Sequence, residues 1–206
     1  MSASATAEPI LAAQAWKTNG HMIEDVARLG YLRKDVPLLD PTYGKGTFWK
    51  RWKPDVLVAH DIKLDGVDFT MLPHSDESFE QIAFDPPYVA KGGRQTSGIK
   101  VQDAAYGQDD CPPTPGTLQL LINSGIREME RVLCSEGILL VKCMPYISSG
   151  HYWQGDIYTY EAAIDHELEL VDRFFYIRKS AGTQPKGRRQ VHARNNCSIL
   201  YVFRKP

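Results

Sequence analysis

The chain has 206 residues, of which 43% are hydrophobic and 24% are charged, a size and balance typical of one globular domain with its own core. Its formal net charge of −1 argues against a globally basic nucleic-acid binder but leaves room for a local basic patch. The four cysteines are scattered without a C-x-x-C pair, a spacing typical of neither a zinc site nor a disulfide framework, so we expect reduced thiols and no metal centre.

The first sixteen residues are small and polar and lack the charged and apolar regions of a signal peptide. No apolar run approaches the ~20 residues that a membrane span needs. We therefore expect a cytoplasmic protein that does not enter a membrane, with residues 1–15 flexible.

Helical and strand-like patterns alternate from residue 20 onward. The patterns predict helices over residues 21–32, 47–52, 117–133 and 158–168, of which 117–133 is clearly amphipathic. They predict strands over residues 36–39, 56–59 and 79–84, which lead to Asp40, Asp61 and Asp85. Further strands are predicted over the almost fully apolar run 137–141 and over 170–177 and 197–203. This alternation indicates a doubly wound, mainly parallel α/β sheet with helices on both faces. The last two strands are joined by a loop alone, which predicts an antiparallel hairpin at the sheet edge.

Three acidic residues follow directly on predicted strands. Ligands of open parallel sheets bind at the carboxyl ends of the strands. Asp40, Asp61 and Asp85 all stand at such ends, so we expect them to share one site.

The tetrapeptide Asp85-Pro86-Pro87-Tyr88 is the most informative motif of the chain. A rigid Pro-Pro step at a strand end holds a carboxylate, a backbone carbonyl and an aromatic ring, which together can grip a flat ring that bears an exocyclic amine. At average residue usage, a chance occurrence in a chain of this length is on the order of one in a thousand. A proline-rich strand exit without chemistry is therefore the weaker interpretation.

This motif resembles the catalytic motif of the amino-methyltransferases, which use S-adenosylmethionine. The resemblance implies that Asp85 and the carbonyl of Pro86 accept the two N–H bonds of the target amine, while Tyr88 stacks on the target ring and Pro87 contacts it. A base inside a duplex cannot bring its amine to such a pocket, so the target must be flipped out or unpaired.

The segment 40–48 lies at a strand-to-helix junction, and its G-x-G alone is equally compatible with a simple turn. Together with the flanking residues it resembles the methionine-binding loop of the same family. Alternatives remain at two positions, because Asp61 could serve only a turn and Asn19 could be a helix N-cap. Asp65 is expected to form a turn. The resemblance implies that the cofactor is held by Asp40, Pro41, Tyr43, Gly44, Gly46, Phe48, Asp61, Asp68, Phe69 and Asn19, with His21 nearby.

The cofactor loop precedes the Asp-Pro-Pro-Tyr motif, an order similar to the gamma group of DNA amino-methyltransferases. The gamma enzymes of restriction systems carry a target-recognition domain, for which this chain has no room. The layout looks like the small stand-alone DNA methylases of phages and actinobacteria. We therefore expect a single class I methyltransferase domain over residues 1–206.

Two other segments could bind the target. The loop 89–116, which contains Lys91 and Arg94, is long enough to act as a lid over the substrate. The segment 178–194 has no acidic residue and follows an acidic stretch, which favours phosphate binding over a merely solvated face; its basic residues include Lys186, Arg188, Arg189 and Arg194. Tyr146 could line the target pocket or simply pack in the core.

The leading hypothesis is a DNA methyltransferase that acts on an exocyclic amine. Adenine N6 is preferred to cytosine N4, because cytosine enzymes more often replace the first Asp of the motif with Ser. An RNA methyltransferase acting on an adenine or guanine amine is the first alternative. A non-catalytic nucleic-acid-binding protein on the same fold is the second. The recognition sequence and the oligomeric state are not predicted.

Overall fold

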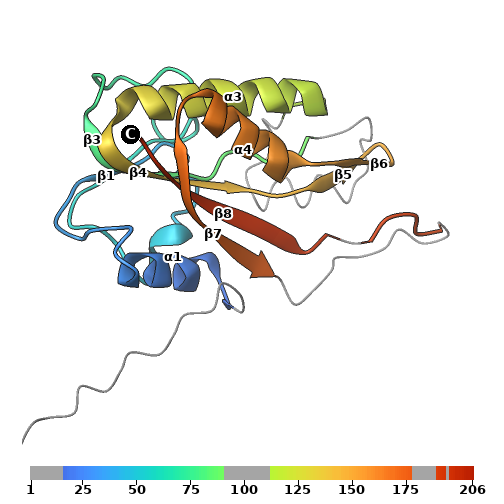
Figure 1. Ribbon diagram of the computed structural model, residues 1–206, viewed down its shortest axis with the longest axis horizontal. Coiled ribbons are helices and arrows are strands. Elements are labelled where there is room, and N and C mark those ends of the chain that lie inside the picture. Colours follow the sequence, from blue (N-terminus) through green and yellow to red (C-terminus); the bar gives the residue numbers. More distant parts are fainter. Residues whose placement is uncertain (1–15, 91–111, 178–188, 194) are drawn as a thin grey trace, which may run out of the picture.

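A computed structural model describes residues 16–90, 112–177, 189–193 and 195–206 of the chain. Within these ranges six strands form one sheet in the order β2-β1-β3-β4-β8-β7 (Figure 1). Strands β2, β1, β3 and β4 are parallel, whereas β8 runs antiparallel to both of its neighbours, β4 and β7. The strands extend over Leu38–Asp40 (β1), Leu57–Ala59 (β2), Phe79–Phe84 (β3), Leu133–Cys143 (β4), Glu169–Ile177 (β7) and Cys197–Arg204 (β8).

The predicted fold class is confirmed, because the sheet is mainly parallel and its last two strands pair in antiparallel fashion. The pair differs from a simple edge hairpin in one respect. Strand β8 inserts between β4 and β7 and pairs with both, so of the last two strands only β7 lies at an edge of the sheet.

Helices cover both faces of the sheet (Figure 1). Leu39 and Leu139 pack in the core on one face, whereas their neighbours Leu38 and Leu140 pack in the core on the other, as the two-residue period of a strand requires. The first core lies under α3 and α4 and the second lies against α1 and the 3-10 helix η1. The helices extend over Asn19–Arg28 (α1), Phe48–Lys50 (η1), Pro115–Val132 (α3) and Gly155–Asp165 (α4).

The first helix begins and ends earlier than the sequence pattern predicted. Its N-cap is Thr18, whose side chain accepts a hydrogen bond from the backbone N–H of His21. Asn19 is the first residue of the helix, so the alternative interpretation of Asn19 as the cap is wrong. The chain leaves the helix at Gly30, whose φ of +87° is accessible to glycine at little cost.

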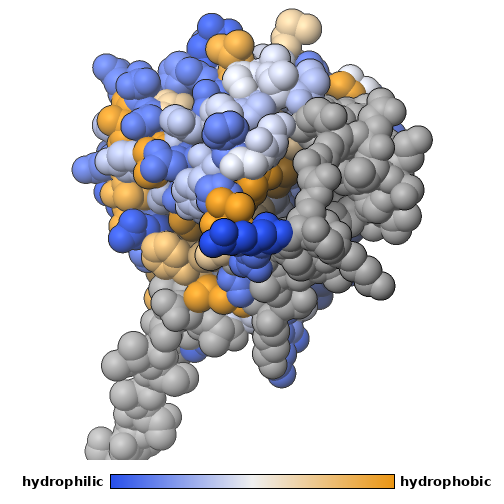
Figure 2. Space-filling view, turned by 90° about the vertical axis from the view of Figure 1, so that its right-hand side faces the viewer, coloured by the Kyte–Doolittle hydropathy of each residue, from blue (hydrophilic) through white to orange (hydrophobic). Residues whose placement is uncertain are grey.

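A short hairpin was not predicted. Strands β5 (Tyr146–Ser148) and β6 (His151–Trp153) pair across Ser149 and Gly150, both of which have positive φ, the backbone that two-residue hairpin turns favour. The hairpin extends beyond the carboxyl end of β4, at the right of Figure 1, and Figure 2 faces that end, with hydrophobic side chains interleaved among hydrophilic ones. Among the described helices, none combines the length and apolar character needed to cross a membrane.

Candidate active site

The candidate site lies at the carboxyl ends of three adjacent strands. Asp40 is the last residue of β1, Asp85 follows β3 directly, and β1 pairs in parallel with β3. On the other side of β1, the backbone N–H of His60 donates to the carbonyl of Asp40 at 2.8 Å, which brings Asp61 to the same edge. The structure therefore brings together the three acidic residues expected to share a site.

Asp40 anchors the loop that follows it. Its side chain is buried, with Oδ2 accepting a hydrogen bond from the indole Nε1 of Trp49 at 2.7 Å and Oδ1 accepting one from the backbone N–H of Thr42 at 3.0 Å. Burial raises the pKa of Asp40 to about 7, although the bonds from Trp49 and Thr42 oppose the shift. This carboxyl group therefore holds the turn from β1 into η1.

The two glycines of the loop share one steric requirement, and Gly46 has a second. Gly44 and Gly46 have φ of +52° and +61°, in the left-handed region that disfavours side chains. At Gly46 a Cβ would also lie 2.6 Å from the hydroxyl oxygen of Tyr43. The N–H of Gly44 donates to Oδ2 of Asp61 at 3.1 Å, so the loop crosses from β1 to the end of β2 with its backbone closely packed.

Asp85 is paired on one carboxylate oxygen. Its Oδ2 lies 3.6 Å from the ammonium Nζ of Lys142, which is only 4% exposed at the carboxyl end of β4. Its Oδ1 is buried and has no hydrogen-bond partner among the described residues. Burial raises the pKa of Asp85, and the charge of Lys142 opposes that shift. The carboxylate thus presents one acceptor oxygen in a confined space.

Tyr88 lies beside the same lysine. Its hydroxyl is 3.4 Å from Nζ of Lys142, and the ammonium lies 5.2 Å from the centre of its ring, within cation–π range. Tyr88 also lines a cavity of about 180 Å³ together with Tyr146 from β5 and Tyr158 from α4. Burial raises the pKa of Tyr146 to about 12. The structure therefore places Tyr146, predicted to line either the target pocket or the core, in one cavity with Tyr88.

The remaining cofactor candidates have local roles in the structure. Asp61 accepts a hydrogen bond from the N–H of Lys63 and Asp68 accepts two from Thr70, so both stabilise turns. Phe69 packs edge-on against Phe84 of β3, with ring centres 5.1 Å apart. A cofactor contact of these residues remains a prediction.

Asn19 and Asp65 complete the set of candidates near the loop. The Oδ1 atom of Asn19 is buried without a hydrogen-bond partner among the described residues, so the side chain offers an acceptor that the fold does not use. Asp65 forms the expected turn, because it accepts hydrogen bonds from the N–H groups of Asp61 and Val67 and bonds to the ring of His60.

Part of the predicted target-binding set lies outside the described residues, namely Lys91, Arg94, Lys186, Arg188 and Arg194. Arg189 is described and exposed. The prediction missed Thr42, Trp49 and the role of Lys142. The lysine had a sequence signal, because a single charge ends the apolar run of a buried strand. Within the described ranges, no cluster of three or more potential metal ligands occurs.

Comparison with known proteins supports the fold. No protein-family model matches the sequence, and no curated protein matches it. TrmN from Thermus thermophilus superposes with a TM-score of 0.53 at 14% identity, covering 90% of this chain and 48% of that chain. The [4+2]-cyclase SpnF superposes with a TM-score of 0.52 at 15% identity, covering 90% of this chain and 81% of that chain.

The chain has a Rossmann-like methyltransferase fold. A candidate DNA modification methylase from Thermus thermophilus, solved with S-adenosyl-L-methionine, matches at 12% identity with a TM-score of 0.44. The match covers 68% of this chain and 53% of that chain. This TM-score is too low to support an argument about function. The chain spans about half the length of the first solved structures it matches. One of the two better superpositions is a cyclase, so the fold does not by itself decide the reaction.

Proposed function

We propose that this chain transfers a methyl group from S-adenosylmethionine to an exocyclic amine of a nucleic-acid base, with adenine N6 in DNA as the preferred target. The observation that carries the proposal is the state of Asp85, whose Oδ2 faces Lys142 at 3.6 Å while Oδ1 is buried without a hydrogen-bond donor among the described residues. A buried acceptor without a donor is costly, and a base amine supplies that donor.

The residues around the loop 40–48 fit the cofactor. Gly44 leaves the loop open on the side where a Cβ would point, Asn19 offers a buried acceptor, and Asp40 holds the loop in place through its bonds to Thr42 and Trp49. We infer that these residues hold the cofactor together with Asp61 and the other members of the predicted set. When bound, S-adenosylmethionine supplies an electrophilic methyl group on a sulfonium.

The catalytic contribution of this chain is the placement of two acceptors. An exocyclic amine is a poor nucleophile, because its lone pair is delocalised into the ring. If Oδ1 of Asp85 and the carbonyl of Pro86 accept its two N–H bonds, the nitrogen gains electron density and is held in place. The same two acceptors stabilise the positive charge that develops on the nitrogen, without having to reorient. The methylated amine then loses a proton readily to water.

The burial of the candidate site limits which bases it can bind. The Oδ1 atom of Asp85 is buried at the strand ends, so a duplex base must be flipped out before its amine meets the carboxylate. We infer that the ring of Tyr88 contacts the face of that base. Adenine in DNA is preferred because of the intact Asp-Pro-Pro-Tyr sequence and because the cofactor loop precedes it.

The proposal is tested in a host that lacks its own DNA methylases. The wild type, Asp85→Ala and Asp55→Ala are expressed, and nucleosides from DNA and RNA are analysed by mass spectrometry. Asp55 is a suitable control, because its exposed carboxylate lies 3.8 Å from Lys34 and away from the strand ends that carry the site. We expect N6-methyladenine in DNA with the wild type and Asp55→Ala but not with Asp85→Ala.

Other outcomes overturn the proposal in different parts. N4-methylcytosine in DNA would show that the target base is cytosine and not adenine. Methylation confined to RNA would exclude DNA as the substrate. If neither pool gains a methylated base, methyl transfer to nucleic-acid amines is refuted, and the binding protein on the same fold becomes the better account.

A further inference from the structure

Lys142 is a buried cation at the centre of the candidate site. It precedes the last residue of β4, and its side chain is 4% exposed. Its ammonium lies 3.6 Å from Oδ2 of Asp85 and 3.4 Å from the hydroxyl of Tyr88. It also faces two aromatic rings, at 5.2 Å from the ring centre of Tyr88 and 5.6 Å from that of Phe48. One side chain thus contacts both ends of the Asp-Pro-Pro-Tyr motif and the first residue of η1.

Stability alone does not explain a lysine at this position. Moving an ammonium group out of water costs several kcal/mol, and replacing a buried ion pair with apolar side chains is often neutral or stabilising. The preceding residues of β4, Leu139, Leu140 and Val141, are fully buried and apolar. A methionine at position 142 would suit the same core, so the charge has a role beyond packing.

We propose that Lys142 is the positioning residue of the amine-binding site: it keeps Asp85 ionised, occupies its Oδ2 so that Oδ1 is left for the amine, and fixes the ring of Tyr88 beside it. The inference rests on the proposed function, since it assigns a role within the same site. It adds a residue of β4 to a site whose sequence motifs come from the ends of β1 and β3.

The charges around the lysine determine the direction of the effect. Burial acts to lower the pKa of Lys142, but Asp85 and Tyr88 outweigh it and raise that pKa, so the side chain is cationic at neutral pH. The charge of Asp85 also opposes the ionisation of Asp40 across the site. The neighbouring thiol of Cys143 has a pKa raised well above its usual value by burial, with Asp156 adding to the effect, and it stays neutral. Without Lys142, the pKa of Asp85 would therefore be higher, and its carboxyl group would stay protonated up to a higher pH.

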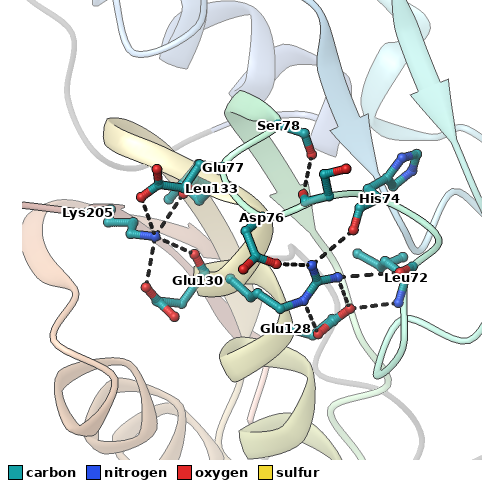
Figure 3. Close-up of polar contacts among 11 residues, drawn as sticks. Leu72, His74, Asp76, Glu77, Ser78, Glu128, Glu130, Leu133 and Lys205 are labelled. Carbon is teal, nitrogen blue, oxygen red and sulfur yellow. Dashed lines mark hydrogen bonds and ion pairs between the residues drawn. The ribbon is translucent and has the colours of Figure 1, made fainter.

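The test uses Lys142→Met, which removes the charge and keeps the length, and Lys142→Arg, which keeps the charge. Lys205→Met is the matched control: this lysine is also largely buried, with Nζ 2.9 Å from Glu130 and 3.5 Å from Glu77, and Figure 3 shows the three side chains together. Lys205 follows β8, and its Nζ donates to the carbonyl of Leu133, the first residue of β4, so it lies at the other end of that strand from Lys142.

Two quantities are measured on the full chain. The first is the titration of the Asp85 carboxyl carbon by ¹³C NMR, assigned by its loss in Asp85→Asn, which needs no substrate. The second is the pH dependence of kcat/KM for methyl transfer. An opposite charge this close lowers the pKa of a carboxyl group by about 1–3 units. For Lys142→Met we therefore expect the titration and the acid limb of the rate profile to move up by about 1–2 pH units, with neither moved in Lys142→Arg or Lys205→Met.

The outcomes separate this inference from the proposed function. If the Asp85 titration in Lys142→Met coincides with that of the wild type, the lysine does not keep Asp85 ionised and the inference is overturned. If the titration moves but the wild type methylates no amine, the pairing stands and the proposed function fails. If the titration moves and activity is unchanged across the pH range, Lys142 does not position the site.

Discussion

The side-chain hydroxyl of Thr42 accepts a hydrogen bond from the backbone N–H of Asp85 at 2.8 Å. The N–H of Thr42 in turn donates to Oδ1 of Asp40 at 3.0 Å. One residue therefore joins the carboxyl ends of β1 and β3. Since the backbone of Asp85 determines where its carboxylate and the next carbonyl lie, this link couples the candidate cofactor loop to the candidate catalytic motif.

Thr42→Val should loosen that coupling. The valine has nearly the same shape but leaves the N–H of Asp85 without its acceptor, at a cost of about 1–3 kcal/mol. For a chain of this size we expect the melting temperature to fall by about 3–10 °C, measured by circular dichroism. Thr42→Ser keeps the hydroxyl and should recover most of the loss; equal losses in the two variants would mean that the bond to Asp85 is not what matters.

Much of this arrangement could be predicted from the sequence, because it follows from local patterns. The apolar run before Asp85 predicted a strand at 79–84, which is where β3 lies. The same reasoning placed Asp40, Asp61 and Asp85 at strand ends that share one site, because parallel strands expose their carboxyl ends at one edge. What these residues bind remains a prediction.

The contacts within the site could not be predicted in this way. Lys142 meets Asp85 across 57 positions of sequence, a distance that no periodic pattern records. Trp49 belongs to a short 3-10 helix whose orientation depends on the packing of η1 against α1. The three-residue strands β5 and β6 are too short to show a clear alternation.

The ionisation of Asp40 predicts an unusual pH dependence of stability. Its pKa of about 7 lies above the ordinary 3.8, because burial disfavours the charged form, so the folded chain binds a proton here that the unfolded chain releases. Its contribution is therefore full below pH ~4 and is lost as the pH rises towards 7. Each pH unit in that window changes the free energy of unfolding by up to about 1.4 kcal/mol.

Asp40→Asn should remove this pH-dependent contribution to the free energy of unfolding. The free energies of unfolding of Asp40→Asn and the wild type are measured by urea denaturation at several pH values. Between pH ~4 and 7 the wild type should lose stability relative to the variant, and above pH ~7 the difference should stay constant. Trp49→Phe deletes the indole donor that lowers the pKa of Asp40, so in this variant the upper end of the window should move to higher pH. A pH-independent difference between Asp40→Asn and the wild type would show that Asp40 is ionised throughout.

Gly46→Ala should damage the loop through a specific clash. The new Cβ would lie 2.6 Å from the hydroxyl oxygen and 2.7 Å from Cζ of Tyr43. Gly66→Ala is the matched control, because Gly66 also has a positive φ, +78°, but a Cβ there meets nothing within 4 Å. Both variants should lose about 1 kcal/mol to backbone strain, and Gly46→Ala should lose more.

A double-mutant cycle isolates the clash at Gly46. In a Tyr43→Ala background the ring that the Cβ would meet is absent, so Gly46→Ala should cost no more than Gly66→Ala. Coupling between positions 43 and 46 should amount to about 0.5–3 kcal/mol, measured by thermal unfolding. Additive losses would show that the ring of Tyr43 moves aside without cost.

Arg131 of α3 should stabilise the segment that leads from Asp68 to β3. Its guanidinium donates to Oδ1 of Asp76 and Oε1 of Glu128, at 2.6 Å each, and to the carbonyl of His74 at 2.9 Å. Figure 3 shows Leu72, His74, Asp76 and Glu128 converging there. We expect Arg131→Ala to cost about 2–3 kcal/mol, because Glu128 loses the guanidinium that donates two hydrogen bonds to its carboxylate.

The fork of the guanidinium, rather than its charge alone, should carry this effect. A lysine cannot donate to two carboxylates and a carbonyl in the same planar arrangement, so Arg131→Lys should recover less than half of the loss. Arg127→Ala, one turn earlier on α3, is the control for the loss of an arginine from this helix and should change the free energy of unfolding by about 0.5 kcal/mol or less. Hydrogen exchange should then show faster opening of residues 72–76 in Arg131→Ala and Arg131→Lys but not in Arg127→Ala; unchanged exchange in Arg131→Ala would mean that this segment is held by its own turns.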